Sequence, residues 1–282
     1  MKNFTDKVAV ITGAGSGIGR SLAVKLAERG ARLALSDIDT AAVAETAERC
    51  ERLGAQAVSF GLDVADRPAV YAHSDEVMDR FGQVNLVFNN AGVALGADVI
   101  DMEWDDFEWL MGINFWGVTY GTKAFLPHLI ASGDGHIVNV SSVFGLMGIP
   151  SQSAYNSAKF AVRGFTEALR QEMRAAKYPV GVTCVHPGGI KTNIAVNARG
   201  VPADADREQI RKGFDLIAIT RADSAARIIL RGVEKNKPRV LIGPDARVFD
   251  AIPRVIGPRY EDIGAPLYRL GRGVAGRFGI EM

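Results

Sequence analysis

A tyrosine and a lysine spaced four residues apart are the first residues in this sequence that could do chemistry together. Tyr155 and Lys159 open a stretch with helical periodicity, so their side chains are expected on one face of a helix. A free phenol has a pKa of about 10, too high for an efficient base at neutral pH, and a neighbouring ammonium group favours the phenolate. The pair predicts a proton-transferring tyrosine, although such pairs are also common on solvated helices.

Two polar residues elsewhere could complete such a site. Ser142 follows an apolar segment, 13 residues before the tyrosine, and its hydroxyl could hydrogen-bond a substrate oxygen. Its neighbour Ser141 is the rival for that role. Asn114 stands in the apolar, aromatic stretch 112–116, where a buried amide needs partners. It either kinks a helix and holds a water near Lys159, or is an amide satisfied within the core.

A glycine-rich turn joins the first predicted strand to the first predicted helix. Three of its four glycines, Gly13, Gly17 and Gly19, form the pattern G-x-x-x-G-x-G, and Ile18 stands where the commoner G-x-G-x-x-G pattern has its third glycine. Glycines let the backbone approach a pyrophosphate, and a helix N-terminus offers it unpaired N–H groups. The strand–turn–helix context therefore predicts a dinucleotide site that includes Ser16 and Ile18.

An acidic residue ends the second predicted strand. Asp37 lies 18 residues after Gly19, where a carboxylate can accept hydrogen bonds from ribose hydroxyls and repel a 2′-phosphate. No basic residue occurs within 36–39, which favours NAD over NADP, and Ile38 is expected beside the same ribose. The alternative is that Asp37 or Asp39 only caps the next helix, a role that suits Asp39 better.

Polar turns also follow the third and fourth predicted strands. They are Asp63-Val64 and Asn90-Ala91-Gly92. Because ligands of parallel sheets bind at the carboxyl ends of the strands, we expect both turns to contact the cofactor. Ordinary turn chemistry is the alternative for residues of these types.

Short β-branched segments alternate with amphipathic helical segments along most of the chain. This alternation predicts a Rossmann-type, doubly wound α/β fold with a mainly parallel seven-stranded sheet and helices on both faces. The predicted strands are Val8–Thr12, Arg32–Ser36, Ala57–Gly61, Leu86–Asn89, His136–Val140, Val180–Val185 and Val240–Gly243. The predicted helices are Gly17–Glu28, Thr40–Leu53, Arg67–Phe81, Trp104–Ala131, Ala154–Lys177 and Ala222–Lys235.

Two segments fall outside this alternation. Residues of about 188–214 form a long, polar, Gly/Pro-punctuated segment that predicts a lid within a domain of residues 1–243. Residues 244–282 mix apolar and arginine side chains. We expect this extension to pack on the domain or on a neighbouring subunit; contact with a membrane surface is the alternative.

Composition excludes several classes of protein. The 282 residues carry 33 basic and 32 acidic side chains, and this balance offers no field for nucleic acid. The N-terminus lacks a signal-peptide pattern, and no apolar run could span a bilayer. The two cysteines, Cys50 and Cys184, predict free thiols in a reducing compartment and a cytoplasmic protein. Cys184 and His186 are too few for a metal site, so none is expected.

Together these motifs resemble the compact, single-domain branch of the short-chain dehydrogenase/reductase family. The resemblance covers about residues 5–243 and rests on segments that occur in the family's order. The matching segments are Thr12–Gly19, Asp63, Asn89–Gly92, Asn114, Ser142, Tyr155–Lys159 and Pro187–Thr192.

The resemblance implies a catalytic tetrad of Asn114, Ser142, Tyr155 and Lys159. Tyr155 would be the acid–base, Lys159 would lower its pKa and hold the nicotinamide ribose, Ser142 would polarise the substrate and Asn114 would anchor a relay water. The segment Pro187-Gly188-Gly189-Ile190-Lys191-Thr192 would contact the nicotinamide, through Ile190 and Thr192 above all. His186 replaces an asparagine common in the family, a change expected to affect turn bonding.

The expected activity is NAD-dependent interconversion of a secondary alcohol and a ketone or aldehyde. An inactive dinucleotide-binding sensor or scaffold, an NADP-dependent carbonyl reductase, and an epimerase or dehydratase of the extended branch are the alternatives. An apolar substrate is expected, since the candidate lining is mostly apolar. The candidates are Val93, Leu95, Val143, Phe144, Leu146, Met147, Ile149 and the lid 194–214. The resemblance also implies a homodimer or homotetramer built through the long helices.

Overall fold

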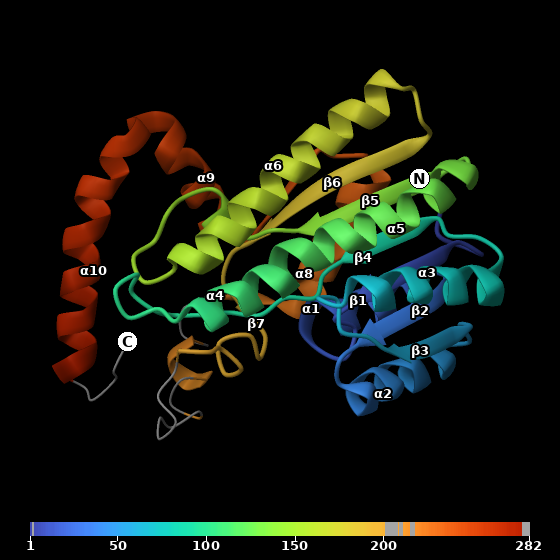
Figure 1. Cartoon of the computed structure of the whole chain (residues 1–282), viewed down its shortest axis with the longest axis horizontal. Coiled ribbons are helices and arrows are strands. Elements are labelled where there is room, and N and C mark those ends of the chain that lie inside the picture. The colour runs from blue at the N-terminus through green and yellow to red at the C-terminus, as the bar shows by residue number, and fades with distance from the viewer. Residues whose placement is uncertain (2, 201–207, 209–210, 215–217, 278–282) are drawn as a thin grey trace.

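A seven-stranded, wholly parallel sheet forms the centre of the computed structural model (Figure 1). The structure describes residues 1, 3–200, 208, 211–214 and 218–277. The strand order β3-β2-β1-β4-β5-β6-β9 confirms the predicted doubly wound fold. The strands are β1 (Val8–Thr12), β2 (Arg32–Asp37), β3 (Ala57–Gly61), β4 (Leu86–Asn89), β5 (Gly135–Val140), β6 (Val180–Pro187) and β9 (Arg239–Ile242).

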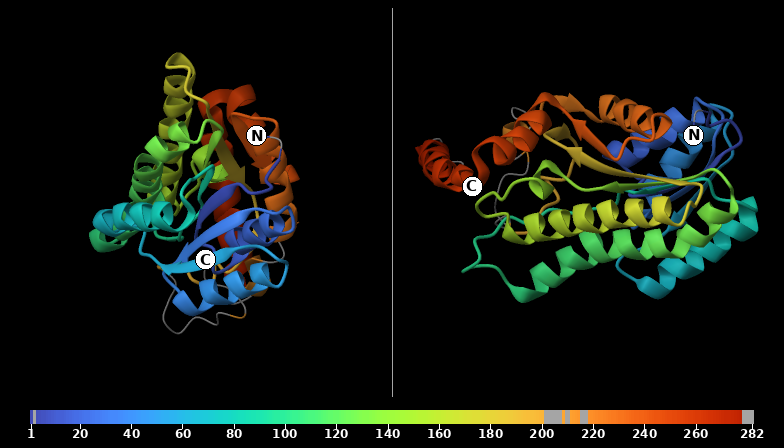
Figure 2. Two further views of the ribbon diagram at one scale, coloured as in Figure 1. Left: turned by 90° about the vertical axis from the view of Figure 1, so that its right-hand side faces the viewer. Right: turned by 90° about the horizontal axis from the view of Figure 1, so that it is seen from above.

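Helices cover both faces of the sheet (Figure 2). Helices α1, α2 and α8 share one apolar core with β1 and β2, while α3, α5 and α6 share a second core on the opposite face. The helices are α1 (Gly17–Ala27), α2 (Thr40–Glu51), α3 (Arg67–Phe81), α4 (Trp104–Met111), α5 (Gly117–Ala131), α6 (Ser153–Ala175) and α8 (Ala222–Glu234). Every residue of β1, β4 and β5 is buried, as the runs of consecutive apolar residues predict for strands covered on both faces.

The helix predicted over residues 104–131 is interrupted. A π-helical turn, η1 (Gly112–Trp116), separates α4 from α5, with the buried Asn114 at its centre. The sequence pattern missed this break because apolar periodicity continues through it. A single wide turn can be inserted without changing which face of a helix is buried.

The last two sheet strands differ from the prediction in the residues at which they begin or end. β6 continues to Pro187 because β9 pairs with it as far as Pro187↔Ile242, and β9 begins one residue earlier than predicted. Gly243 does not belong to β9. Its φ of +99° turns the chain sharply away from the sheet.

A short parallel pair follows the sheet, β7 (Ile190–Lys191) with β8 (Thr220–Arg221). It closes the segment in which a lid is predicted. Before residue 201, this segment pairs with the loop after β4, through a bridge between Leu95 and Arg199. Lid residues 201–207 and 209–210 lie outside the described part of the chain.

The C-terminal extension forms two helices joined by a short 3₁₀ turn, η3 (Gly257–Arg259). They are α9 (Pro244–Ile256) and α10 (Tyr260–Arg277), and α10 lies along one end of the molecule (Figure 1). The Phe249 ring of α9 packs 6.3 Å from Phe144, and the Tyr260 hydroxyl accepts a hydrogen bond from the N–H of Gly148 at 3.2 Å. The extension therefore packs beside the loop that follows β5.

Among the described helices, none is both long and apolar enough to cross a membrane. Both cysteines are free and buried, and burial raises the pKa of Cys50 to about 11 and that of Cys184 to about 12.

Candidate active site

The glycine turn between β1 and α1 is a close-packed backbone cradle. Gly13 and Gly17 have φ values of +65° and +53°, which residues other than glycine rarely adopt. A Cβ at Gly13 would lie 2.8 Å from the Cα of Ala91, and one at Gly19 would overlap the carbonyl oxygen of Gly13. The turn is thus held in a shape that leaves bare backbone at a helix N-terminus, which is what a pyrophosphate requires.

Hydrogen bonds tie this cradle to the end of β4. The Thr12 hydroxyl accepts from the N–H groups of Asn90 at 3.0 Å and Ala91 at 3.1 Å. In return, the Asn90 amide donates to the carbonyls of Thr12 at 3.0 Å and Gly13 at 3.2 Å. The structure therefore brings Asn90 and Ala91 to the cradle. Our sequence reasoning gave Thr12 no role of its own, although a threonine that ends an apolar strand is a visible signal.

The end of β2 also reaches the cradle. One Asp37 carboxylate oxygen accepts from the N–H of Gly15 at 2.8 Å, and the other accepts from the N–H of Asp39 at 3.0 Å. Asp39 caps α2 by accepting from the N–H of Ala42 at 2.9 Å. Asp39 is therefore the cap of α2, and the contact of Asp37 with a ribose stays a prediction. Ile38 is 73% exposed beside them.

The turn after β3 lies differently. The Asp63 carboxylate accepts from the N–H of Ala65 at 2.9 Å, an ordinary turn contact. Val64 is buried against the start of α5, where a Cβ at Gly117 would lie 2.8 Å from its side chain. In the free protein these two residues shape the loop, as the turn-chemistry alternative describes.

Three predicted catalytic side chains converge at the ends of β5 and α6. Tyr155 and Lys159 are buried on one face of α6, with the Lys159 Nζ 5.6 Å from the centre of the tyrosine ring. Ser142 hydrogen-bonds the phenol. Ser141 instead donates its hydroxyl to the carbonyl of Lys159 at 2.7 Å, so Ser142 is the serine that faces Tyr155.

Burial dominates the ionisation of this pair. It raises the pKa of Tyr155 to about 12, against a smaller lowering by the hydrogen bond with Ser142, and it lowers the pKa of Lys159 to about 8. The lowering of the phenol's pKa by Lys159 therefore stays a prediction for the cofactor-bound protein, while burial raises that pKa in the free protein. Both side chains lie in a region of low dielectric, which favours their neutral forms.

Lys159 also connects the catalytic face, which we define as Ser142, Tyr155 and Lys159, to the loop after β4 that borders the cofactor cradle. Its ammonium group donates to the carbonyl of Val140 at 3.1 Å. A Cβ at Gly92 would lie 3.5 Å from the Lys159 Nζ and 3.1 Å from the amide oxygen of Asn114. Gly92 thus leaves room where the loop after β4 meets the two residues.

Asn114 is an amide satisfied within the core. Its oxygen accepts from the N–H of Val93 and its NH₂ group donates to the carbonyl of Val93, both at 2.8 Å. The side chain fixes the loop after β4 to the π-helical turn. The predicted role of Asn114 in anchoring a relay water stays a prediction.

The segment after β6 closes the opposite side of the cradle. Ile190 is buried, and a Cβ at Gly17 would lie 3.0 Å from the methyl carbon of Thr192. Gly188 donates its N–H to the carbonyl of Ile242 at 2.9 Å, beside the Pro187 pairing of β6 with β9. The segment Pro187–Thr192 thus lies between β9 and the glycine turn, and its contacts with a nicotinamide stay a prediction.

His186 affects local bonding, as its position before Pro187 suggests. Its Nδ1 lies 2.8 Å from the carbonyl oxygen of Ser142, so Nδ1 must carry the proton and donate it. Burial lowers the pKa of His186 to about 4, which keeps the ring neutral. The histidine thereby ties β6 to the serine that faces Tyr155.

A buried polar network beneath the site was missed by the sequence reasoning. The Asn89 amide donates to Thr122 at 3.0 Å and to Asn139 at 2.8 Å, and Asn139 donates to Thr166 at 3.1 Å. The network joins β4, β5, α5 and α6, whose ends carry the catalytic groups. Asparagines inside apolar strands were the available signal, because a buried amide needs partners.

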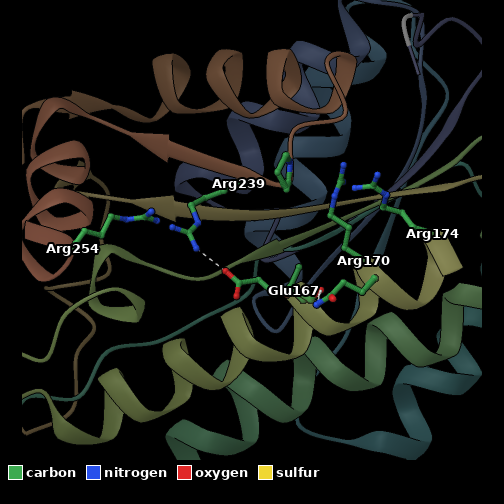
Figure 3. Close-up of a pocket in the computed structure, with 8 residues that line it drawn as sticks. Glu167, Arg170, Arg174, Arg239 and Arg254 are labelled. Atoms are coloured by element: carbon green, nitrogen blue, oxygen red, sulfur yellow. Dashed lines mark hydrogen bonds and ion pairs between the residues drawn. The ribbon is translucent and has the colours of Figure 1, made fainter. Parts of the chain in front are cut away.

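An arginine-lined groove of about 620 Å³ lies between α6 and the edge strand β9, with Arg254 of α9 at its border (Figure 3). Arg239 pairs with Glu167 at 2.6 Å and with Asp250 at 2.8 Å, and Arg170 donates to the carbonyl of Val182 at 2.5 Å. The groove contains none of the predicted site residues. The described residues contain no cluster of three or more His, Cys, Asp or Glu side chains that could hold a metal ion.

Comparison with known proteins agrees with this geometry. Residues 7–203 match the family model described as short chain dehydrogenase. The chain is 54% identical over 266 residues to SadH of Mycobacterium tuberculosis, which is described as an oxidoreductase. The matched residues are 94% of this chain and 96% of SadH.

Two solved structures that share the fold are complexes with a nicotinamide dinucleotide or a derivative of one. A short-chain dehydrogenase/reductase from Burkholderia phymatum in complex with NAD has a TM-score of 0.82 and 32% identity, covering 94% of this chain and 97% of that one. An alcohol dehydrogenase from Thermococcus sibiricus complexed with 5-hydroxy-NADP has a TM-score of 0.71 and 26% identity, covering 84% and 95%. This chain belongs to the short-chain dehydrogenase/reductase family, whose oxidoreductases act on CH–OH groups with a nicotinamide dinucleotide.

Proposed function

We propose that this protein is an NAD-dependent oxidoreductase that interconverts an apolar secondary alcohol and its ketone, with Tyr155 as the acid–base. The convergence of Tyr155, Lys159 and Ser142 beside the glycine cradle carries this proposal. Residues 1–243 would hold the cofactor and the catalytic groups, and the extension from residue 244 would form an outer wall.

Each polar group has a role that its contacts support. The Tyr155 hydroxyl takes the alcohol proton during oxidation and returns it during reduction. Ser142, which hydrogen-bonds the phenol, is placed to hold the same substrate oxygen. The Lys159 Nζ lies 5.6 Å from the centre of the ring, where its charge would favour the phenolate. Asn114 keeps the loop that carries Gly92 in place beside the ammonium group.

The acid–base role needs a change in the ionisation of the free protein. With a pKa of about 12, the Tyr155 phenol is protonated and suited to donating a proton to a carbonyl. To accept a proton, it must be brought toward the phenolate by positive charge nearby. When bound, the nicotinamide accepts or supplies the hydride and is positively charged in its oxidised form. Ile190 and Thr192 are the residues we assign to its carboxamide.

Asp37 supports NAD as the cofactor. Its carboxylate is fixed by two backbone N–H groups at the edge of the cradle, where the adenosine ribose would lie. A fixed negative charge accepts hydrogen bonds from ribose hydroxyls and repels a 2′-phosphate.

An apolar substrate is supported by the third core cluster. Leu95, Leu110, Ala154 and Tyr155 pack together, with Phe107, Trp109, Met111, Phe115 and Phe144 against them. The Phe144 ring meets the Tyr155 ring edge-on, with 6.0 Å between centroids. Groups beside the reacting phenol are therefore mainly apolar, and a charged substrate would find few partners among them.

Cofactor titration followed by an alcohol panel tests this function. We expect the protein to bind NADH at least about tenfold more tightly than NADPH, because a hydrogen bond to a charged group contributes about 1.5–3 kcal/mol. Asp37→Asn should reduce that preference, with Asp39→Asn as the matched control. In the panel, apolar secondary alcohols should reduce NAD fastest. Tighter binding of NADPH, or fastest turnover of small charged hydroxy acids, would contradict the proposal.

A further inference from the structure

Asp245, the second residue of α9, reaches back from the C-terminal extension to the segment after β6. Its carboxylate accepts a hydrogen bond from the N–H of Gly189 at 2.6 Å, across 56 positions of the sequence. The sharp turn at Gly243 makes this possible because it directs the start of α9 toward the end of β6. Neither composition nor helical periodicity distinguishes this aspartate from an ordinary first-turn residue.

The carboxylate lies in space that only glycine leaves open at two neighbouring positions. A Cβ at Gly188 or at Gly243 would collide with its oxygens. The oxygen Oδ1 is buried and has no hydrogen-bond partner among the described residues. Burying a carboxylate oxygen without a hydrogen-bond partner costs free energy, so the fold holds Asp245 here at a cost in stability. The two glycines and the aspartate together form a close backbone–carboxylate contact.

The contact continues to the cofactor cradle through a short chain of neighbours. The Gly189 peptide is held on both sides, since its carbonyl accepts from the N–H of Thr220 at 3.2 Å. Ile190 follows at once and pairs with Thr220 in the β7–β8 ladder. Two residues later, Thr192 packs its methyl group against Gly17. A displacement at Gly189 would therefore be transmitted to Ile190 and Thr192, the two residues that the proposed function assigns to the nicotinamide.

We infer that Asp245 is a positioning residue for the nicotinamide half of the cofactor, which it holds indirectly by fixing the Gly188–Thr192 segment. This rests on the proposed function, in that Ile190 and Thr192 are taken to meet the nicotinamide. It makes the first turn of the C-terminal extension part of the cofactor site. Asp37, which the proposed function assigns to the adenosine ribose, has its hydrogen bonds to Gly15 and Asp39 and none to this segment.

Binding of NADH and of ADP-ribose to Asp245→Ala tests the inference. ADP-ribose has the adenosine and both phosphates but no nicotinamide. The variant should bind NADH about tenfold more weakly, because it loses a hydrogen bond to a charged acceptor, while ADP-ribose affinity stays within about twofold. Asp245→Asn keeps an acceptor oxygen and should recover NADH binding to within about threefold of wild type. Asp262→Ala, which removes an exposed carboxylate of α10, is the matched control.

Unchanged NADH affinity in Asp245→Ala would overturn the inference. So would an equal loss for NADH and ADP-ribose, since that result indicates a general disturbance of the fold rather than of the nicotinamide half. Failure of the wild-type protein to bind NADH at all would instead contradict the proposed function, so the two failures can be told apart.

Discussion

The cofactor cradle and the catalytic face lie side by side but are built on different principles. In the cradle, Thr12, Asn90 and Asp37 each engage backbone groups, and glycines exclude side chains from the space. In the catalytic face, Tyr155 and Lys159 are buried among apolar groups, and burial moves the pKa of each toward its neutral form.

This difference separates binding from chemistry. The cradle has its shape fixed by hydrogen bonds within the free protein and needs little rearrangement to accept a dinucleotide. Under the proposed function, the ionisation of the catalytic face would depend on the charge that arrives with the cofactor, because burial in the free protein keeps the Tyr155 phenol protonated. Changes in one region should therefore affect affinity, and changes in the other should affect turnover.

Removing the phenol should give the largest effect and sharpen the comparison most. In Tyr155→Phe the ring and its packing against Phe144 remain, but no group can exchange the proton. We expect kcat to fall about a thousandfold, within the range that general acid–base catalysis contributes, while NADH affinity changes less than about threefold. Tyr178→Phe, at an exposed tyrosine beyond α6, is the control and should be unchanged. If Tyr155→Phe kept more than a tenth of the wild-type kcat, the proposed separation between cofactor binding and proton transfer would be contradicted.

Crowding the cradle should give a smaller effect of the opposite kind. A Cβ at Gly19 overlaps the Gly13 carbonyl and lies 2.7 Å from the Asn90 amide, so Gly19→Ala must displace the turn. Overpacking typically costs about 1–3 kcal/mol, and we expect NADH affinity to fall about a hundredfold. Isothermal titration calorimetry gives the affinity, and circular dichroism confirms that the variant is folded.

Gly164→Ala provides the matched control for this substitution. Gly164 lies in the interior of α6, and a Cβ added there would meet no neighbouring atom within 4 Å. Alanine at this position should stabilise the fold by about 0.5–1 kcal/mol. NADH affinity should not change. If Gly19→Ala bound NADH as tightly as Gly164→Ala does, the cradle would not be the pyrophosphate site.

The same contrast explains what could be predicted from the sequence. The cradle depends on backbone conformation, which glycines at 13, 17 and 19 reveal directly, and on strand ends, which apolar runs place to within one or two residues. The opposite wall depends on contacts between distant segments. Asp245 meets Gly189, Tyr260 meets Gly148, and Asn114 meets Val93 only once the chain is folded.

The pKa of Tyr155 was also beyond the reach of spacing alone. The Tyr/Lys pair correctly places two side chains on one helix face, but their ionisation depends on how deeply that face is buried. Burial is a property of the tertiary structure, and here its effect on the pKa exceeds that of the neighbouring groups.

Hydride transfer itself can be followed with an isotope. The fastest alcohol of the panel, deuterated at its carbinol carbon, would be oxidised by the wild-type protein with NAD, and the reduced cofactor examined by NMR. Our account predicts that deuterium appears at C4 of the nicotinamide, on one face only, and not in the solvent. Deuterium released to water, or alcohol consumed while NAD stays oxidised, would contradict it.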